Sequence, residues 1–130
     1  MIRLVIVDDM PDIRNYLAEE LAAASEQFSV VGAAEDGTEA VKLVDSLLPD
    51  VVLMDIQMKT RTEGIYAIRI IHERHPDIKC IALTIHEDDE LIFQAYLAGA
   101  ADYIIKTRSI DTITVSYTHL RAHETTLHLV

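Results

Sequence analysis

Short apolar runs alternate along the chain with longer stretches in which apolar residues recur at helical spacing. The short runs are rich in Val and Ile, as is typical of strands buried on both faces of a sheet. They comprise residues 2–7, 29–34, 51–54, 78–83 and 103–105, of which the second is the weakest. The longer stretches place apolar side chains on one face of a helix. These faces are Ile13, Leu17, Leu21 and Ala24; Ala40, Val44 and Leu47; Ile65, Ile68 and Ile71; and Leu91, Ala95 and Ala98.

This alternation of strand and helix favours right-handed crossovers and a parallel sheet with helices on both faces. For five strands we expect an α/β fold, a flavodoxin-like doubly wound parallel sheet in the order 2-1-3-4-5 within a three-layer sandwich. In such a sheet, ligands bind beyond the carboxyl ends of the strands, where the winding reverses between strands 1 and 3. The residues that directly follow the strands are therefore the candidates for function.

Composition narrows the classes of partner. The 130 residues suit a single domain. They carry 11 Lys and Arg against 22 Asp and Glu, a net charge of −11 that argues against binding to nucleic acid or to an anionic membrane. Cys80 is the single cysteine and cannot form an intramolecular disulfide, no signal peptide opens the chain, and no apolar run could span a bilayer. We therefore expect a cytoplasmic protein.

Charged and hydroxyl side chains follow four of the expected strands. Asp8 and Asp9 follow the first, Asp55 the third, Thr84 the fourth and Lys106 the fifth. Three carboxylates at one edge repel one another, and a bound divalent cation relieves this repulsion. Oxygen ligands favour a hard ion, so Mg²⁺ is the expected metal.

A carboxylate beside Mg²⁺, a hydroxyl and an ammonium group can attack phosphorus, because the cations neutralise the phosphoryl oxygens. Asp55 is the better nucleophile, because a lone Asp after a buried strand is costly without a task. Asp8 and Asp9 then form the metal pair, while Asp12, ahead of Ile13, suits a helix cap. The expected product is an aspartyl phosphate.

Four segments of the chain form a recognisable set of motifs: Val7-Asp8-Asp9, Leu53-Met54-Asp55-Ile56, Ala82-Leu83-Thr84 and the run from Gly99 to Lys106. Together they resemble the receiver domain of bacterial two-component response regulators. The resemblance covers roughly residues 1–112. It implies that Asp8 and Asp9 bind Mg²⁺, that Asp55 is both phosphoacceptor and metal ligand, and that Gln57 offers its backbone carbonyl to the metal.

The resemblance also implies a switch. Thr84 would be the switching hydroxyl, Tyr103 the aromatic rotamer switch and Lys106 the cation that binds the phosphoryl group. Simple packing is the other interpretation of Tyr103. Segments 84–90 and 109–111 look most like receivers attached to a LuxR-type helix-turn-helix domain. The implied partners are a sensor histidine kinase and a second copy of the chain, bound through helix 4, strand 5 and helix 5.

The chain departs from the family pattern at three places. Lys59 stands where proline is usual, and Gly64 follows Asp55 one residue later than usual, so the loop between them is expected to be longer. Thr107 replaces a common proline, which puts a cis peptide there in doubt. Residues 113–130 look like translated adapter sequence. We therefore divide the chain into a receiver domain, 1–112, and a foreign-looking tail, 113–130, which replaces most of the fifth helix and weakens the dimer.

These features predict a phosphorylation-dependent switch, a fragment of a transcriptional regulator whose own chemistry is limited to slow self-catalysed phosphorylation and dephosphorylation. A degenerate receiver that serves only as a docking scaffold is the alternative.

Two other functions fit the residues less well. A haloacid dehalogenase-like phosphatase also forms aspartyl phosphate, but it needs a second Asp at the position of Gln57. A flavodoxin-like electron carrier would place the phosphate of its cofactor beside Asp8 and Asp9, which repel it.

Overall fold

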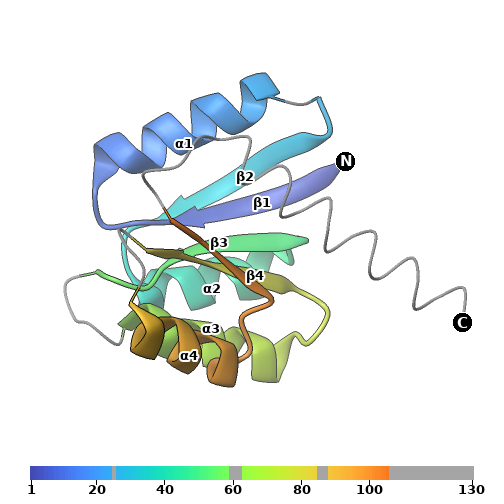
Figure 1. Ribbon diagram of the computed structural model, residues 1–130. Coiled ribbons are helices and arrows are strands. Elements are labelled where there is room, and N and C mark those ends of the chain that lie inside the picture. Colours follow the sequence, from blue (N-terminus) through green and yellow to red (C-terminus); the bar gives the residue numbers. More distant parts are fainter. Residues whose placement is uncertain (25, 59–62, 85–87, 106–130) are drawn as a thin grey trace, which may run out of the picture.

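The computed structural model describes residues 1–24, 26–58, 63–84 and 88–105 (Figure 1). The strands within these ranges are β1 (Ile2–Val7), β2 (Phe28–Ala34), β3 (Val51–Asp55), β4 (Lys79–Thr84) and β5 (Asp102–Ile105). The helices are α1 (Pro11–Ala24), α2 (Gly37–Leu47), α3 (Glu63–Arg74) and α4 (Asp89–Ala98). The fifth helix expected from the sequence lies outside the described residues.

The strands form one parallel sheet in the order β2-β1-β3-β4-β5, which confirms the expected doubly wound topology. Helix α1 covers one face of the sheet, and α2, α3 and α4 cover the other (Figure 1). No helix among the described ranges is long and apolar enough to cross a membrane.

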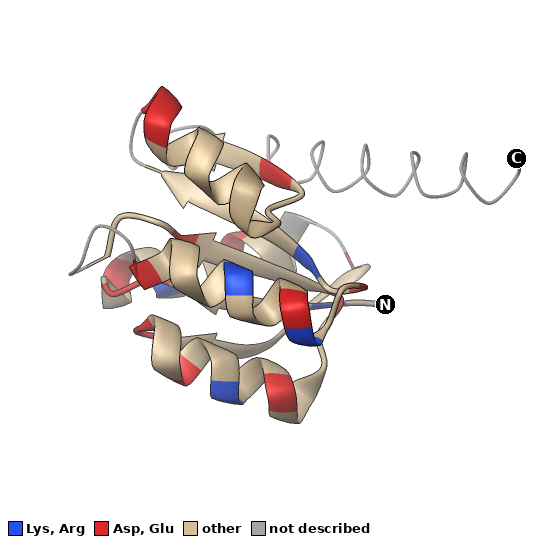
Figure 2. Ribbon diagram, turned by 90° about the horizontal axis from the view of Figure 1, so that it is seen from below, with Lys and Arg blue, Asp and Glu red and all other residues tan. Residues whose placement is uncertain are grey.

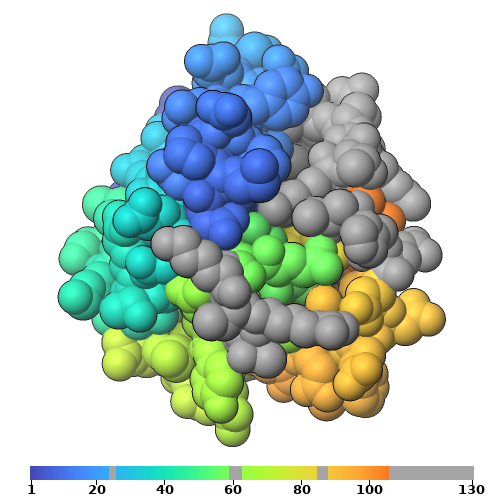
Figure 3. Space-filling view, turned by 90° about the vertical axis from the view of Figure 1, so that its left-hand side faces the viewer, coloured from blue at the N-terminus to red at the C-terminus, as the bar shows by residue number. Residues whose placement is uncertain are grey.

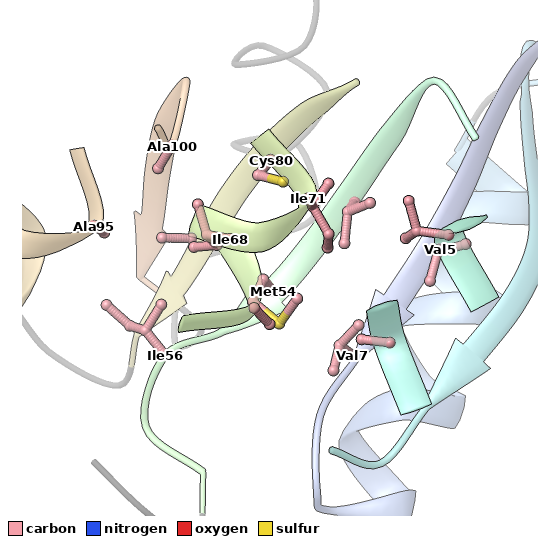
Figure 4. Packing of buried hydrophobic residues seen from close by; sticks show 14 of the residues in the cluster. Val5, Val7, Met54, Ile56, Ile68, Ile71, Cys80, Ala95 and Ala100 are labelled. Atoms are coloured by element: carbon pink, nitrogen blue, oxygen red, sulfur yellow. The ribbon is translucent and has the colours of Figure 1, made fainter. Parts of the chain in front are cut away.

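The core consists of two apolar clusters, one on each face of the sheet. Val5 and Val7 belong to the cluster under α2, α3 and α4, whereas Leu4 and Ile6 belong to the cluster under α1. Successive residues of β1 therefore alternate between two buried faces, as expected for a central parallel strand. Figure 4 shows part of the cluster under α2, α3 and α4, which contains Met54 of β3 together with Ile68 and Ile71 of α3.

Four of the five expected strands differ from the observed ones by one residue at one or both ends. Strands β2 and β5 begin one residue earlier than expected, β3 includes Asp55, and β4 is shifted by one residue so that it includes Thr84. Residue Ile78 lies before β4, because its backbone N–H donates to the carbonyl of His75 and closes a turn there. Asp12 is the second residue of α1 rather than its cap, because α1 already begins at Pro11. A carboxylate in the first helical turn is still favoured by the helix dipole.

Cys80 lies in the first cluster with 1% of its surface exposed (Figure 4). Burial raises the pKa of its thiol from 9.0 to about 12. We expect the folded protein to resist thiol reagents at neutral pH and to react only as fast as it unfolds. The thiol also makes stability fall as the pH rises above 9, where the unfolded thiol ionises and the folded one does not.

Both effects can be measured by the rate of thiol labelling with and without urea, and by denaturation across alkaline pH. The Cys80→Ala variant should lose that part of the pH dependence. Rapid labelling of the native protein would contradict the buried position.

Candidate functional site

Three buried polar side chains lie at the carboxyl edge of the sheet. Val7 of β1 pairs with Met54 of β3, and Asp55 pairs with Leu83 of β4. The next positions along the strands are therefore neighbours, and they hold Asp8, Asp55 and Thr84. Each has 0% of its surface exposed. Among the residues that the structure describes, they are the only buried polar or charged ones.

Figure 3 looks onto this edge along the strands. The blue segment at the start of α1 and the green segment that follows β3 meet at the centre of the face. The loops after β1 and β3 thus converge, as expected where the winding of the sheet reverses.

Three carboxylates of this edge can reach a common ion. One oxygen each from Asp8, Asp9 and Asp55 lies within 4.8 Å of the others. Asp9 is partly exposed, whereas the other two are buried. A purely carboxylate set with one side open to solvent fits a hard cation such as Mg²⁺.

Matching turns hold the two buried carboxylates. The backbone N–H of Met10 donates to Asp8 Oδ1 at 3.0 Å, and that of Gln57 donates to Asp55 Oδ1 at 2.8 Å. Each Asp thus accepts from the second residue after it, an arrangement that turns the chain away from the strand. Arg14 Nη1 also donates to the carbonyl oxygen of Asp8 at 2.8 Å, which ties α1 to the same turn.

A side-chain hydrogen bond joins the ends of β3 and β4. Thr84 Oγ1 donates to Gln57 Oε1 at 2.8 Å. The sequence predicts a role only for the backbone carbonyl of Gln57, so this contact of its side chain was not expected. The signal in the sequence was an amide side chain two residues after Asp55, which the topology carries to the edge where β4 ends.

The first turn of α3 packs against the backbone at the end of β3. A Cβ atom added to Gly64 would lie 2.1 Å from the backbone oxygen of Asp55 and 2.8 Å from Ile56 Cα. Glu63 Oε1 accepts from the backbone N–H of Gly37 at 2.8 Å, which links the start of α3 to the start of α2. Glycine at position 64 therefore permits α3 to support the backbone that carries Asp55.

Tyr103 lies in β5, half-buried beside α4. Its ring meets that of Tyr96 edge to face, with centroids 6.2 Å apart and planes at 87°. Burial, and then the nearby charge of Asp102, raise the pKa of Tyr96. The ring of Tyr103 is thus in contact with α4, the helix next to the strand on which it lies.

The remaining site expectations fall on residues that the structure does not describe. These are Lys106, Lys59, Thr107 and the tail 113–130.

Comparison with known proteins gives a consistent match. A family model for the response regulator receiver domain matches residues 4–118. The transcriptional regulatory protein DegU of Brevibacillus brevis is 38% identical over 112 residues, which cover 86% of this chain and 47% of that protein. The chain spans about half the length of the curated relatives it matches.

Solved structures share the fold. A LuxR-family two-component response regulator from Aurantimonas sp. SI85-9A1 has a TM-score of 0.85 at 27% identity, covering 95% of this chain and 86% of that one. The BeF₃-activated receiver domain of DrrB has a TM-score of 0.75 at 25% identity, covering 92% of this chain and 96% of that one.

Proposed function

The chain belongs to the response regulator receiver domain family, the family of two-component signalling, and from that premise we propose that Asp55 accepts a phosphoryl group and makes this domain a phosphorylation-dependent switch. The observation that carries the proposal is the carboxyl edge of the sheet. Asp55 is buried there, with a carboxylate oxygen within 4.8 Å of oxygens of Asp8 and Asp9, and it lies next to the strand that ends at Thr84.

We propose Mg²⁺ as the cofactor of this site. Its ligands would be the carboxylates of Asp8, Asp9 and Asp55 together with the backbone carbonyl of Gln57. The carboxylate donors fit a hard cation, because their oxygens lie within 4.8 Å of one another. When bound, the ion would neutralise negative charge on the phosphoryl oxygens.

The transfer itself would be a displacement at phosphorus. A carboxylate oxygen of Asp55 forms the new O–P bond, and the bond from phosphorus to the donor breaks, its electron pair leaving with the donor. The hydroxyl of Thr84 would donate to a phosphoryl oxygen, and Lys106 would supply a positive charge. Return to the resting state would be slow hydrolysis of the acyl phosphate by water, the domain's own catalysis.

The direct test is incubation of the purified chain with Mg²⁺ and acetyl phosphate, followed by intact mass spectrometry. We expect a single phosphoryl group per chain, which disappears when the metal is chelated. A chain that stays unmodified while remaining folded would favour the alternative function, a degenerate receiver that serves as a docking scaffold.

Mg²⁺ is expected to stabilise the folded chain, because binding to the native state alone shifts the unfolding equilibrium. At a hundredfold excess over its dissociation constant the gain would be about 2.7 kcal/mol. The Asp55→Asn variant should gain clearly less, because it lacks one ligand charge. Thermal unfolding with and without Mg²⁺ measures both gains.

Glu19→Gln is the control for this comparison, because it removes one negative charge from an exposed position of α1. It should keep the full Mg²⁺ increment. If all three proteins gained equally, the metal would bind elsewhere.

We propose a sensor histidine kinase as the phosphoryl donor and a longer transcriptional regulator as the parent protein. Support comes from relatives named as transcriptional regulatory proteins, of which the chain spans about half. The net charge of −11 makes direct binding of nucleic acid by this chain unfavourable.

A homodimer through α4, β5 and the fifth helix is the second proposed partnership. Helix α4 exposes Phe93, Tyr96 and Leu97 and has no Lys or Arg, its acidic residues lying in the first turn (Figure 2). We propose that the receiver comprises residues 1–112 and that the tail, residues 113–130, stands in place of most of the fifth helix. Much of the dimer surface would then be missing. We therefore expect little or no shift towards a dimer on a sizing column after phosphorylation. A complete shift would contradict the division.

A further inference from the structure

We propose that the Gln57 side chain is a positioning residue that holds the Thr84 hydroxyl in the resting state and has to release it when Asp55 is phosphorylated. The proposal rests on the proposed function. The observation behind it is the hydrogen bond from Thr84 Oγ1 to Gln57 Oε1, 2.8 Å long.

Gln57 contacts both Asp55 and Thr84, and it uses different atoms for the two contacts. Its backbone N–H donates to Asp55 Oδ1 at 2.8 Å, while its side-chain oxygen accepts from Thr84. Thr84 is fully buried, and Gln57 is partly exposed. The amide side chain can therefore move outward into solvent, whereas the hydroxyl stays at the buried edge of the sheet.

The Thr84 hydroxyl can donate either to Gln57 Oε1 or to a phosphoryl oxygen on Asp55, but not to both at once. A threonine hydroxyl has one proton to donate. While that proton lies on Gln57 Oε1, it cannot be donated to an oxygen of a phosphoryl group on Asp55. Phosphorylation would thus exchange one acceptor for another, with no covalent change at either side chain. A phosphoryl oxygen is anionic and accepts more strongly than a neutral amide, so the exchange proceeds towards the phosphoryl group.

Breaking the hydrogen bond from Thr84 to Gln57 adds a free-energy cost to the switch. Loss of one neutral hydrogen bond in the resting state corresponds to roughly a three- to tenfold change in an equilibrium constant. Removing the Gln57 acceptor should strengthen binding of a phosphoryl mimic by about that factor.

The test uses beryllofluoride at saturating Mg²⁺, with its affinity measured by isothermal titration calorimetry. Gln57→Met keeps the length of the side chain and both backbone groups but lacks the acceptor. We expect it to bind beryllofluoride roughly three- to tenfold more tightly than the wild type. The Gln94→Met variant, with the same change at an exposed position of α4, should match the wild type.

A double-mutant cycle shows whether the effect runs through Thr84. Thr84→Val removes the hydroxyl at nearly constant shape, and in that background Gln57→Met should no longer alter the affinity. A purely structural effect of Gln57 would persist in both backgrounds and would overturn the proposal.

A measurement on the wild type avoids any effect of a substitution on folding. In nuclear magnetic resonance spectra of the free protein, the Thr84 hydroxyl and the Gln57 side-chain amide should show a mutual contact that is lost when beryllofluoride is added. Persistence of that contact in the bound form would overturn the proposal. A wild type that does not bind beryllofluoride would instead refute the proposed function, so the two failures are distinguishable.

Discussion

Replacing Asp55 with Asn is expected to reduce phosphoryl incorporation from acetyl phosphate below detection. The side chain is buried at the end of β3, and its carboxylate is the proposed nucleophile. An amide carries no negative charge to attack phosphorus, and it is also a poorer ligand for Mg²⁺. Removing the nucleophile therefore takes away both the bond-forming atom and part of the metal site. Intact mass spectrometry after incubation with Mg²⁺ and acetyl phosphate measures the loss.

Two further Asp→Asn variants calibrate this result. Asp12→Asn makes the same chemical change at an exposed position of α1 and should be labelled like the wild type. Asp9→Asn weakens the proposed metal site without removing the nucleophile, so its labelling should be slower and should recover at higher Mg²⁺. If Asp55→Asn were labelled as fast as Asp12→Asn, another carboxylate would be the acceptor.

The second large effect is expected at Gly64. A methyl group there would lie 2.1 Å from the backbone oxygen of Asp55, far inside any real contact distance. The neighbour is the backbone of β3 itself, so no side chain can turn aside to make room. Helix α3 and the end of β3 would have to separate. We expect Gly64→Ala to lower the free energy of unfolding by about 3 kcal/mol, the upper part of the range for overpacking.

Gly32→Ala is the matched control for Gly64→Ala. Its added Cβ would lie 2.9 Å from Leu43 Cδ2 and 3.0 Å from Leu47 Cδ1, the ends of flexible side chains that can shift. We therefore expect a clearly smaller loss of stability in urea denaturation. Gly64→Ala should also weaken Mg²⁺ binding, because the displaced backbone carries Asp55. A Gly64→Ala protein with wild-type stability would show that α3 does not rest on β3 as described.

The main features of the site followed from the sequence for a simple physical reason. Parallel strands end at a common edge, so the residues after buried runs must meet there whatever the details of the loops. Asp8, Asp55 and Thr84 could be placed on this basis alone, and the structure brings them to that edge. The buried faces of the helices could be predicted because their spacing depends only on helical periodicity.

Contacts between side chains could not be predicted in this way. Periodicity places Asp45 and His75 near the surface, but it does not show that Arg74 and His75 both bond to Asp45, at 2.6 and 2.8 Å. These bonds, with that from His75 foremost, lower the pKa of Asp45. They depend on how the ends of α2 and α3 lie together, and residues about 30 positions apart carry no local signal of it.

The same limit applies within the site. The bond between Thr84 and Gln57 depends on the rotamers of two side chains from different strand ends. The close approach of Gly64 to Asp55 depends on the path by which α3 returns to the sheet. Spacing marked Gly64 only as a shifted position in a family pattern. Its steric role follows from the 2.1 Å distance between an added Cβ atom and the backbone oxygen of Asp55.

Asp55 is the residue that we expect to carry the phosphoryl group, and peptide mapping identifies the modified position. After incubation with Mg²⁺ and acetyl phosphate, borohydride reduction converts an aspartyl phosphate into homoserine, which marks the modified position stably. We predict homoserine at position 55 and at no other Asp, and none when the metal is chelated first. Homoserine at position 8 or 9, or an unmodified Asp55 in a labelled chain, would show that Asp55 is not the phosphoacceptor.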